Sequence, residues 1–219
     1  MSEQREITYK KEILRKSIHL LSLSIPIIYS FVDKYTGLMM LVPVTLFFLA
    51  GDIISHRSGW VRSIVLRYFG SMMREHELRS DRLLLNGASY VLLAACLCVI
   101  VFPKIIGITA FTILIISDIC AALIGRQFGK HKFLDKSLEG TTAFIISAVL
   151  VVWFIAWQFS APSHFLIAGV IASFVGGIIE NISIRLRMDD NFSIPASVGT
   201  TMWLYAVIVP GASSLTTVL

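Results

Sequence analysis

Asp118 is the residue whose position most strongly indicates chemistry, because it lies inside a long apolar stretch of the chain. A charged side chain at the centre of an apolar span costs at least about 2.5 kcal/mol on insertion scales, so such an acid predicts a functional site. Tight glycine turns present backbone amides and lysines supply cations, which suits phosphate groups beside a metal ion. Residues of these kinds follow Asp118, at Gly125, Arg126, Gly129, Lys130, Lys136, Glu139, Gly140 and Thr141.

A second polar cluster precedes the first apolar stretch. Arg15, Lys16 and His19, together with Glu12, are spaced by three and four residues and therefore share one helical stripe. A basic anchor flanking a membrane helix, with an internal Glu12–Lys16 pair, explains most of this pattern. His19 favours a functional interpretation, since it extends the polar stripe into the apolar span.

Two more clusters follow apolar stretches. His76, Glu77 and Asn86 either line the mouth of a site or belong to a solvated loop in which Asn86 caps a helix. Glu180 and Asp190 belong to the last cluster, whose acids suit Mg²⁺, because this ion prefers oxygen ligands and usually takes only one or two from the protein.

The composition predicts an integral membrane protein. Of the 219 residues, 56% are hydrophobic and 15% are charged, whereas soluble domains carry about 25% charge. The whole chain, 1–219, is expected to be one all-α membrane domain, with a segment 1–16 before the first span, an amphipathic loop at 56–82 and a glycine- and lysine-containing loop at 126–140. Stretches near the ~20 residues that cross a bilayer predict seven transmembrane helices, at about 17–34, 36–55, 83–102, 105–125, 141–159, 162–180 and 193–210.

The basic residues predict the orientation of this bundle. Of the 19 Lys and Arg, only Lys34 and Lys104 fall on one side of the seven predicted spans. The positive-inside rule places the other side, with the N-terminus, in the cytoplasm. All four polar clusters then lie at cytoplasmic helix ends, where they can converge. The net charge of +5 fits this topology and anionic headgroups, so nucleic-acid binding is not expected.

These four blocks, in this order, resemble the CTP-dependent lipid kinase family that includes dolichol kinase, phytol kinase and fungal-type diacylglycerol kinase. The resemblance is strongest from Glu12 to His19, from Asp118 to Gly140 and from Glu180 to Pro195. It implies transfer of the terminal phosphoryl group of CTP to a lipid alcohol with a divalent cation. It also implies that four residues are linked to activity: Arg15, Lys16, Asp118 and Gly125.

We therefore expect a lipid kinase at the cytoplasmic face that uses Mg²⁺ and either CTP or another nucleoside triphosphate. The acceptor is expected to be a polyprenol, dolichol, phytol or diacylglycerol. Asp118, Glu180 and Asp190 are the expected metal-side acids, and Glu139 or His19 is the expected base. Nucleotide ligands are expected among Arg15, Lys16, His76, Glu77, Asn86, Gly125, Arg126, Gly129, Lys130, Lys136, Gly140 and Thr141, which makes 126–140 a nucleotide-binding loop.

Two alternatives stay open at this point. The central block is also similar to phosphatidate cytidylyltransferase, which makes CDP-diacylglycerol, although that family's later Lys-Asp and Pro-Gly-His-Gly-Gly signature is absent. The other alternative is a transporter or receptor without catalytic activity. A transporter is expected to carry polar residues at mid-depth and on both sides, whereas here they gather on one side.

Overall fold

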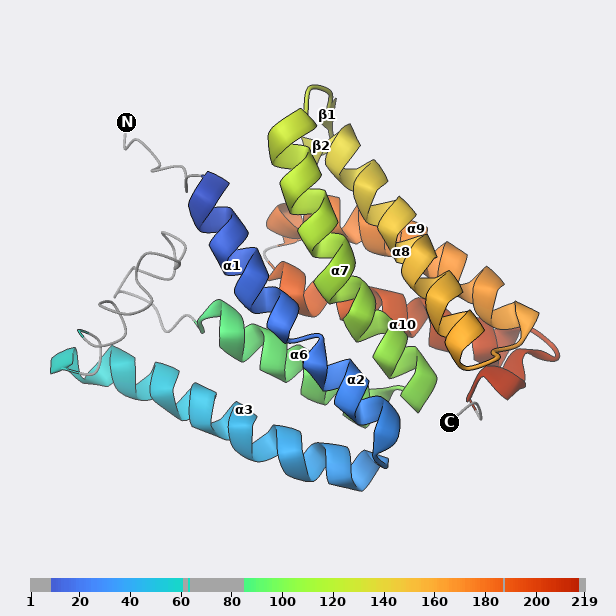
Figure 1. Cartoon of the computed structure of the whole chain (residues 1–219), viewed down its shortest axis with the longest axis horizontal. Coiled ribbons are helices and arrows are strands. Elements are labelled where there is room, and N and C mark those ends of the chain that lie inside the picture. The colour runs from blue at the N-terminus through green and yellow to red at the C-terminus, as the bar shows by residue number, and fades with distance from the viewer. Residues whose placement is uncertain (1–8, 61–62, 64–84, 187, 217–219) are drawn as a thin grey trace.

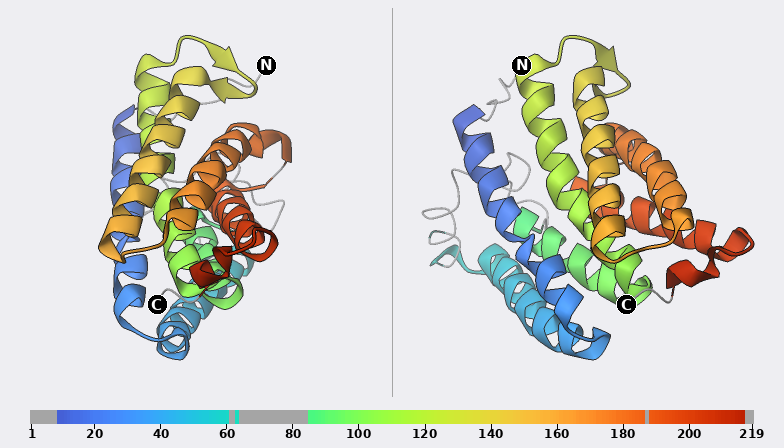
Figure 2. Two further views of the ribbon diagram at one scale, coloured as in Figure 1. Left: turned by 90° about the vertical axis from the view of Figure 1, so that its right-hand side faces the viewer. Right: turned by 45° about the vertical axis from the view of Figure 1, so that its right-hand side comes forward.

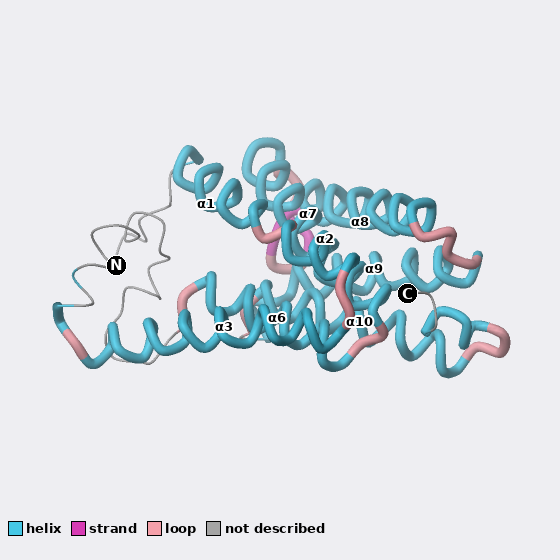
Figure 3. Tube along the Cα trace, turned by 60° about the horizontal axis from the view of Figure 1, so that its bottom comes forward, coloured by secondary structure: helices cyan, strands magenta, loops and turns pink. Residues whose placement is uncertain are grey.

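The computed structural model describes residues 9–60, 63, 85–186 and 188–216. Figure 3 shows that this part of the chain is almost entirely helical, which confirms the all-α class. A short antiparallel hairpin interrupts the helices. The elements are α1 (Tyr9–Leu21), α2 (Ser24–Phe31), α3 (Lys34–Arg57), α6 (Gly87–Val101), α7 (Lys104–Phe128), β1 (Lys132–Phe133), β2 (Lys136–Ser137), α8 (Leu138–Gln158), α9 (Ser163–Leu186), α10 (Asp190–Ile208) and the 3₁₀ helix η1 (Ala212–Thr216).

Helix α7 is the centre of the bundle. It packs against α1, α2, α6, α8 and α10, and 72% of its most apolar window is buried inside the protein. The corresponding share for α3 is only 17%, and α3 runs along one edge beside α6 (Figure 1). Asp118, near the middle of α7, is therefore surrounded by protein, whereas large apolar side chains of α3 such as Met39 and Phe47 are exposed.

Four described helices are long and apolar enough to cross a bilayer, which is compatible with an integral membrane protein. Helix α6 is apolar as well but spans only Gly87–Val101. Seven crossings with a cytoplasmic N-terminus stay a prediction. The four candidate spans are Lys34–Ser55, Lys104–Phe128, Leu138–Gln158 and Ser163–Ser183.

The prediction of one continuous first helix at 17–34 is wrong, since α1 and α2 are separate helices. Pro26 has no N–H, and its ring prevents a helical bond to the carbonyl of Ser22, four residues earlier. The chain turns there instead, and the Ile25 amide donates to Ser22 O at 3.0 Å. Pro26 consequently lies in the first turn of α2, where a missing donor costs little.

The loop predicted at 126–140 is shorter than expected and contains secondary structure. Helix α7 continues to Phe128, the hairpin follows, and α8 already begins at Leu138. Figure 2 shows the hairpin extending beyond the adjoining ends of α7 and α8. The segment 1–16 differs as well, because α1 begins at Tyr9. Most of the predicted loop 56–82 lies outside the described residues.

Glycines allow α7 and α8 to approach closely below the hairpin. A Cβ atom built on Gly140 would lie 3.1 Å from the Ala121 carbonyl oxygen and 3.2 Å from the Gly125 Cα. These neighbours are backbone atoms, which cannot move aside as a flexible side chain can. The glycine pair therefore fixes the distance between the helix that carries Asp118 and the helix that follows the hairpin.

Replacing Gly140 by alanine is expected to lower the free energy of unfolding by about 1 to 3 kcal/mol, as overpacking does in other close contacts. Gly51 in α3 provides the matched control, because a Cβ there meets no atom of the described residues within 4 Å. Gly51→Ala is expected to leave stability unchanged or to raise it by up to about 1 kcal/mol. Thermal unfolding in detergent measures both, and equal effects would contradict the close approach.

Candidate active site

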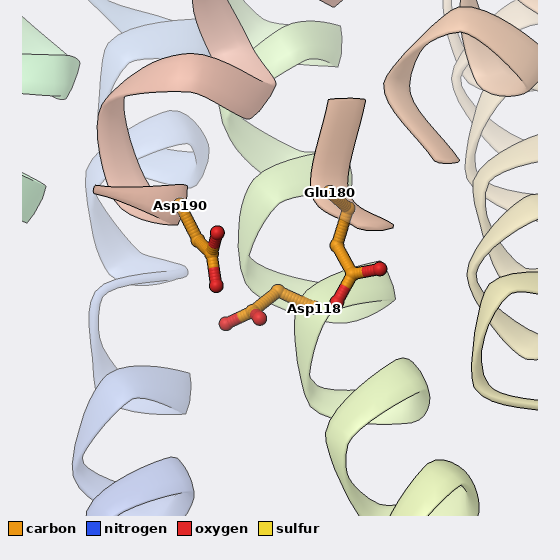
Figure 4. A group of neighbouring side chains, drawn as sticks. All are labelled: Asp118, Glu180 and Asp190. Carbon is orange, nitrogen blue, oxygen red and sulfur yellow. The ribbon is translucent and has the colours of Figure 1, made fainter. Parts of the chain in front are cut away.

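Three carboxylates from three helices meet inside the bundle. Asp118 comes from α7, Glu180 from α9 and Asp190 from the first turn of α10, as Figure 4 shows. One oxygen of each lies within 4.8 Å of the others, and both Asp118 and Glu180 are buried. We call these three side chains the carboxylate cluster. The structure therefore brings together the acids that the sequence predicts on the metal side.

Two lysines from separate elements, α1 and β2, bind the carboxylate cluster. Lys16 of α1 donates a hydrogen bond to Asp118 Oδ2, and its side chain is 5% exposed. Lys136 of β2 donates to Glu180 Oε1 at 2.6 Å and to Asp190 Oδ2 at 3.2 Å. With all five groups ionised, the assembly keeps one net negative charge. Carboxylates buried this close together require such cations, because unpaired buried charges are costly.

The Lys136 ammonium stays charged in this position. Burial by itself lowers the pKa of Lys136, but the attraction of Asp190 and Glu180 outweighs burial, so the pKa is raised above its ordinary value. A raised lysine pKa means that the ion pairs stabilise the fold at neutral pH and are lost only as the pH rises through that pKa. The cluster consequently keeps this cation across the physiological range.

His19 contributes an unpaired nitrogen to the same region. Its Nε2 lies 3.9 Å from Asp118 Oδ2, which is too long for a hydrogen bond. The side chain is 10% exposed, and its buried Nε2 has no hydrogen-bond partner among the residues that the structure describes. Buried polar atoms are nearly always satisfied, so an unpaired one beside a buried acid points to a ligand at this place.

Asn181 is a residue that the sequence interpretation missed. Its side chain is fully buried, and its Oδ1 accepts hydrogen bonds from the backbone amides of Asp135 (2.9 Å) and Lys136 (3.2 Å). Its Nδ2 donates to Thr141 Oγ1 at 2.7 Å. Asn181 therefore joins α9, the hairpin and α8, and it fixes the backbone from which Lys136 reaches Glu180. Its position directly after the predicted acid Glu180 was the feature of the sequence that could have indicated its role.

If nucleotide binds at this hairpin, as the sequence leads us to expect, Asn181→Ala raises the KM for nucleotide about tenfold or more, in the range found for other residues that support ligands. Removing the amide frees the hairpin, and Lys136 then loses its fixed position. Asn181→Asp keeps the acceptor for both backbone amides and is expected to recover part of that loss. Steady-state kinetics of both variants in detergent, with kcat and KM determined separately, distinguish this from a loss of folded protein, which would lower apparent kcat alone.

A salt bridge holds the hairpin to α9 from outside. Arg185 Nη2 donates to Asp135 Oδ1 at 2.7 Å, and this bond raises the pKa of the Arg185 guanidinium. The turn between the strands carries Leu134 with a φ of 50°, in the left-handed region that non-glycine residues seldom adopt. The hairpin is thus held in an unfavourable turn by contacts with α9.

Several predicted nucleotide ligands lie at the end of α7 and the start of α8. Arg126, Gly129 and Lys130 are exposed there, while Gly125 and Gly140 form the close helix contact.

Thr141 is buried, and its hydroxyl donates to Ser137 O in addition to accepting from Asn181. Ser137 caps α8 by accepting from the Gly140 amide.

Other predicted site residues have different partners. Glu139 Oε1 lies 2.8 Å from His131 Nδ1 at the hairpin. Asn86 caps α6 and binds Asp52 of α3, which agrees with the capping interpretation of Asn86. Arg15 is half-buried on α1, the helix that also carries Lys16 and His19. His76 and Glu77 lie outside the described residues.

Comparison with known proteins gives two relatives. The chain is 33% identical over 194 residues to the uncharacterized protein RP860 of Rickettsia prowazekii, a match that covers 87% of this chain and 94% of the relative. It is 29% identical over 124 residues to the probable phytol kinase 1, chloroplastic, of Glycine max, which covers 51% of this chain and 41% of that protein. No family model matches the chain, and no solved structure matches it.

Proposed function

This chain belongs to the family of protein RP860 of Rickettsia prowazekii, and from that premise, with the partial likeness to a probable phytol kinase, we propose that it is a membrane lipid kinase. The donor in this proposal is CTP or another nucleoside triphosphate, and the acceptor is a lipid alcohol. The observation that carries the proposal is the carboxylate cluster with Lys16 and Lys136 bound to it.

The side chains of the cluster fit a magnesium ion. Asp118, Glu180 and Asp190 offer only oxygen ligands, which Mg²⁺ prefers, and few protein ligands are needed because phosphates and waters complete its shell. The unpaired Nε2 of His19 is an independent sign of a ligand beside Asp118. When bound, Mg²⁺ would neutralise negative charge on the nucleotide phosphates. Phosphoryl transfer depends mainly on such positioning and neutralisation.

In the proposed phosphoryl transfer, residues of the chain bind the phosphates and accept the hydroxyl proton. The bond between the γ-phosphorus and the bridging oxygen of the β-phosphate breaks, a bond from the lipid hydroxyl oxygen to that phosphorus forms, and the nucleoside diphosphate leaves. We assign Lys16 and Lys136 to the phosphate oxygens. The hydroxyl proton passes to His19 Nε2, since this nitrogen is unpaired and close to Asp118, whereas Glu139 already binds His131.

The membrane arrangement supports a lipid acceptor. Asp118 lies ten residues before the end of the candidate span Lys104–Phe128, which is about 15 Å along the helix axis. A lipid alcohol already dissolved in the bilayer can enter sideways between helices at that depth. In our proposal the bundle crosses the membrane seven times, and the site opens to the cytoplasm because the basic residues gather at that end.

The test is phosphate transfer by the purified protein in detergent with Mg²⁺, using γ-labelled and α-labelled CTP in parallel and γ-labelled ATP as the competing donor. A panel of polyprenol, dolichol, phytol, diacylglycerol and phosphatidate serves as acceptors. Label from the γ position in a lipid alcohol supports the kinase. Label from the α position in phosphatidate would show a cytidylyltransferase, and label from neither would favour a transporter or receptor.

A further inference from the structure

Lys136 and a divalent cation would need the same oxygens. The Lys136 ammonium binds Glu180 Oε1 and Asp190 Oδ2, which belong to two of the three acids of the carboxylate cluster. A metal ion coordinated by these carboxylates is positively charged as well, and the local charges repel across a few ångströms in a partly buried site. Ammonium and metal therefore compete for the carboxylates.

Lys16 and Lys136 differ in how easily the ammonium group can move away from the carboxylate cluster. Lys16 is 5% exposed and projects from α1, where its neighbours on the helix fix the backbone. The side chain of Lys136 is 26% exposed and projects from a strand of two residues beside a tight turn. A flexible four-carbon stem allows the ammonium to swing without movement of that backbone, which Asn181 holds in place. Lys136 is thus the cation that is able to exchange.

We infer that Lys136 acts as an exchangeable counter-ion, which neutralises Glu180 and Asp190 and moves to a phosphate oxygen when a nucleotide arrives with its divalent cation. This inference rests on the proposed function. The nucleotide supplies new anionic partners for the ammonium, while the metal takes over the carboxylates. Metal and nucleotide then strengthen each other's binding, and by linkage the coupling is the same in both directions. The cluster binds a divalent cation weakly without nucleotide and tightly with it.

Loss of the Lys136 charge is expected to strengthen the binding of a divalent cation, although it removes a side chain of the site. Lys136→Gln removes the competing charge and keeps a hydrogen-bond donor for Glu180. This variant is expected to bind Mn²⁺ about tenfold or more tightly than the wild type when nucleotide is absent, a factor within the usual range of coupling between two sites. The same variant is expected to lose most of the gain in Mn²⁺ affinity that nucleotide produces in the wild type.

The experiment measures free Mn²⁺ by electron paramagnetic resonance during titration of the purified full chain, with and without a non-hydrolysable CTP analogue. Lys136→Arg retains the charge and is expected to bind Mn²⁺ weakly without nucleotide, like the wild type. Lys34→Met is the control for general charge effects, since Lys34 is an exposed lysine whose ammonium donates to the Ile100 carbonyl and not to the carboxylate cluster, and it is expected to leave both affinities unchanged. Lys136→Met provides a second neutral variant if Lys136→Gln is poorly folded.

The Mn²⁺ titrations distinguish failure of the inference about Lys136 from failure of the proposed function. If nucleotide raises Mn²⁺ affinity in the wild type but neither neutral variant binds Mn²⁺ more tightly alone, Lys136 does not compete with the metal, and the inference is overturned while the proposed function stands. If the wild type and both neutral variants bind no Mn²⁺ with or without the analogue, the metal site itself is absent and both proposals fail.

Discussion

Asp118→Asn is expected to lower phosphate transfer by about 10²-fold to 10³-fold, because a carboxylate on a catalytic metal ion contributes several kcal/mol to charge stabilisation. The substitution keeps the shape of the side chain and removes only its charge. It also leaves the Lys16 ammonium buried without its partner. Breaking a buried ion pair by removing one member costs about 3 to 5 kcal/mol, so the variant is expected to be less stable as well.

The double variant Asp118→Asn with Lys16→Met separates these two effects. It removes both charges of the pair, and its thermal unfolding is expected to return toward that of the wild type. Its transfer activity is expected to stay at least as low as that of Asp118→Asn, because Lys16, which we assign to the phosphate oxygens, is lost as well. Recovery of activity together with stability would mean that Asp118 acts only through the ion pair and has no part in the reaction.

His19→Asn is the second substitution with a large expected effect. Removal of a general base typically lowers kcat by about 10²-fold to 10⁴-fold, and the KM for nucleotide is expected to change little. Asparagine fills a similar volume and keeps a polar group near Asp118, which limits the structural disturbance. Initial rates at saturating donor and acceptor measure the effect on kcat.

Glu139→Gln serves as the comparison for His19, since the sequence left the two residues as alternative bases. Glu139 contacts His131 at the start of the hairpin, with Oε1 at 2.8 Å from Nδ1. Its replacement is expected to lower kcat by less than about tenfold, well below the effect of removing a general base, because the Glu139 carboxylate binds His131 and not the carboxylate cluster. A larger loss in Glu139→Gln than in His19→Asn would assign the proton transfer to Glu139.

The acids of the site were predictable for a physical reason. A charged side chain in an apolar span costs free energy, so Asp118 indicated a functional site. The structure places it close to Glu180 and Asp190, its expected partners. The same reasoning applied to Asp52 misleads. Asp52 is buried within a candidate span, but its carboxylate accepts from the Ser89 hydroxyl at 2.7 Å and from the Asn86 amide at 3.0 Å. It joins α3 to the start of α6, which is a structural role.

The β1–β2 hairpin, and the contacts from Asn181 and Arg185 that hold it, could not be predicted from the sequence. Strands of two residues carry no periodicity, and the turn has Leu134 at a left-handed φ where glycine or asparagine is the usual signal. Tertiary contacts to Asn181 and Arg185 hold that turn, and such long-range contacts leave no local pattern. The break before α2 was foreseeable, since Pro26 lies inside the predicted span.

The position of the metal ion decides whether the carboxylate cluster is the active site. A structure of the protein with Mn²⁺ and a non-hydrolysable nucleoside triphosphate, in which the anomalous signal marks manganese, shows where the ion and the phosphates bind. We expect manganese about 2 Å from carboxylate oxygens of the cluster, with the nucleotide phosphates beside Lys16 and Lys136. Manganese and nucleotide bound together at a place remote from Asp118, Glu180 and Asp190 would contradict this expectation.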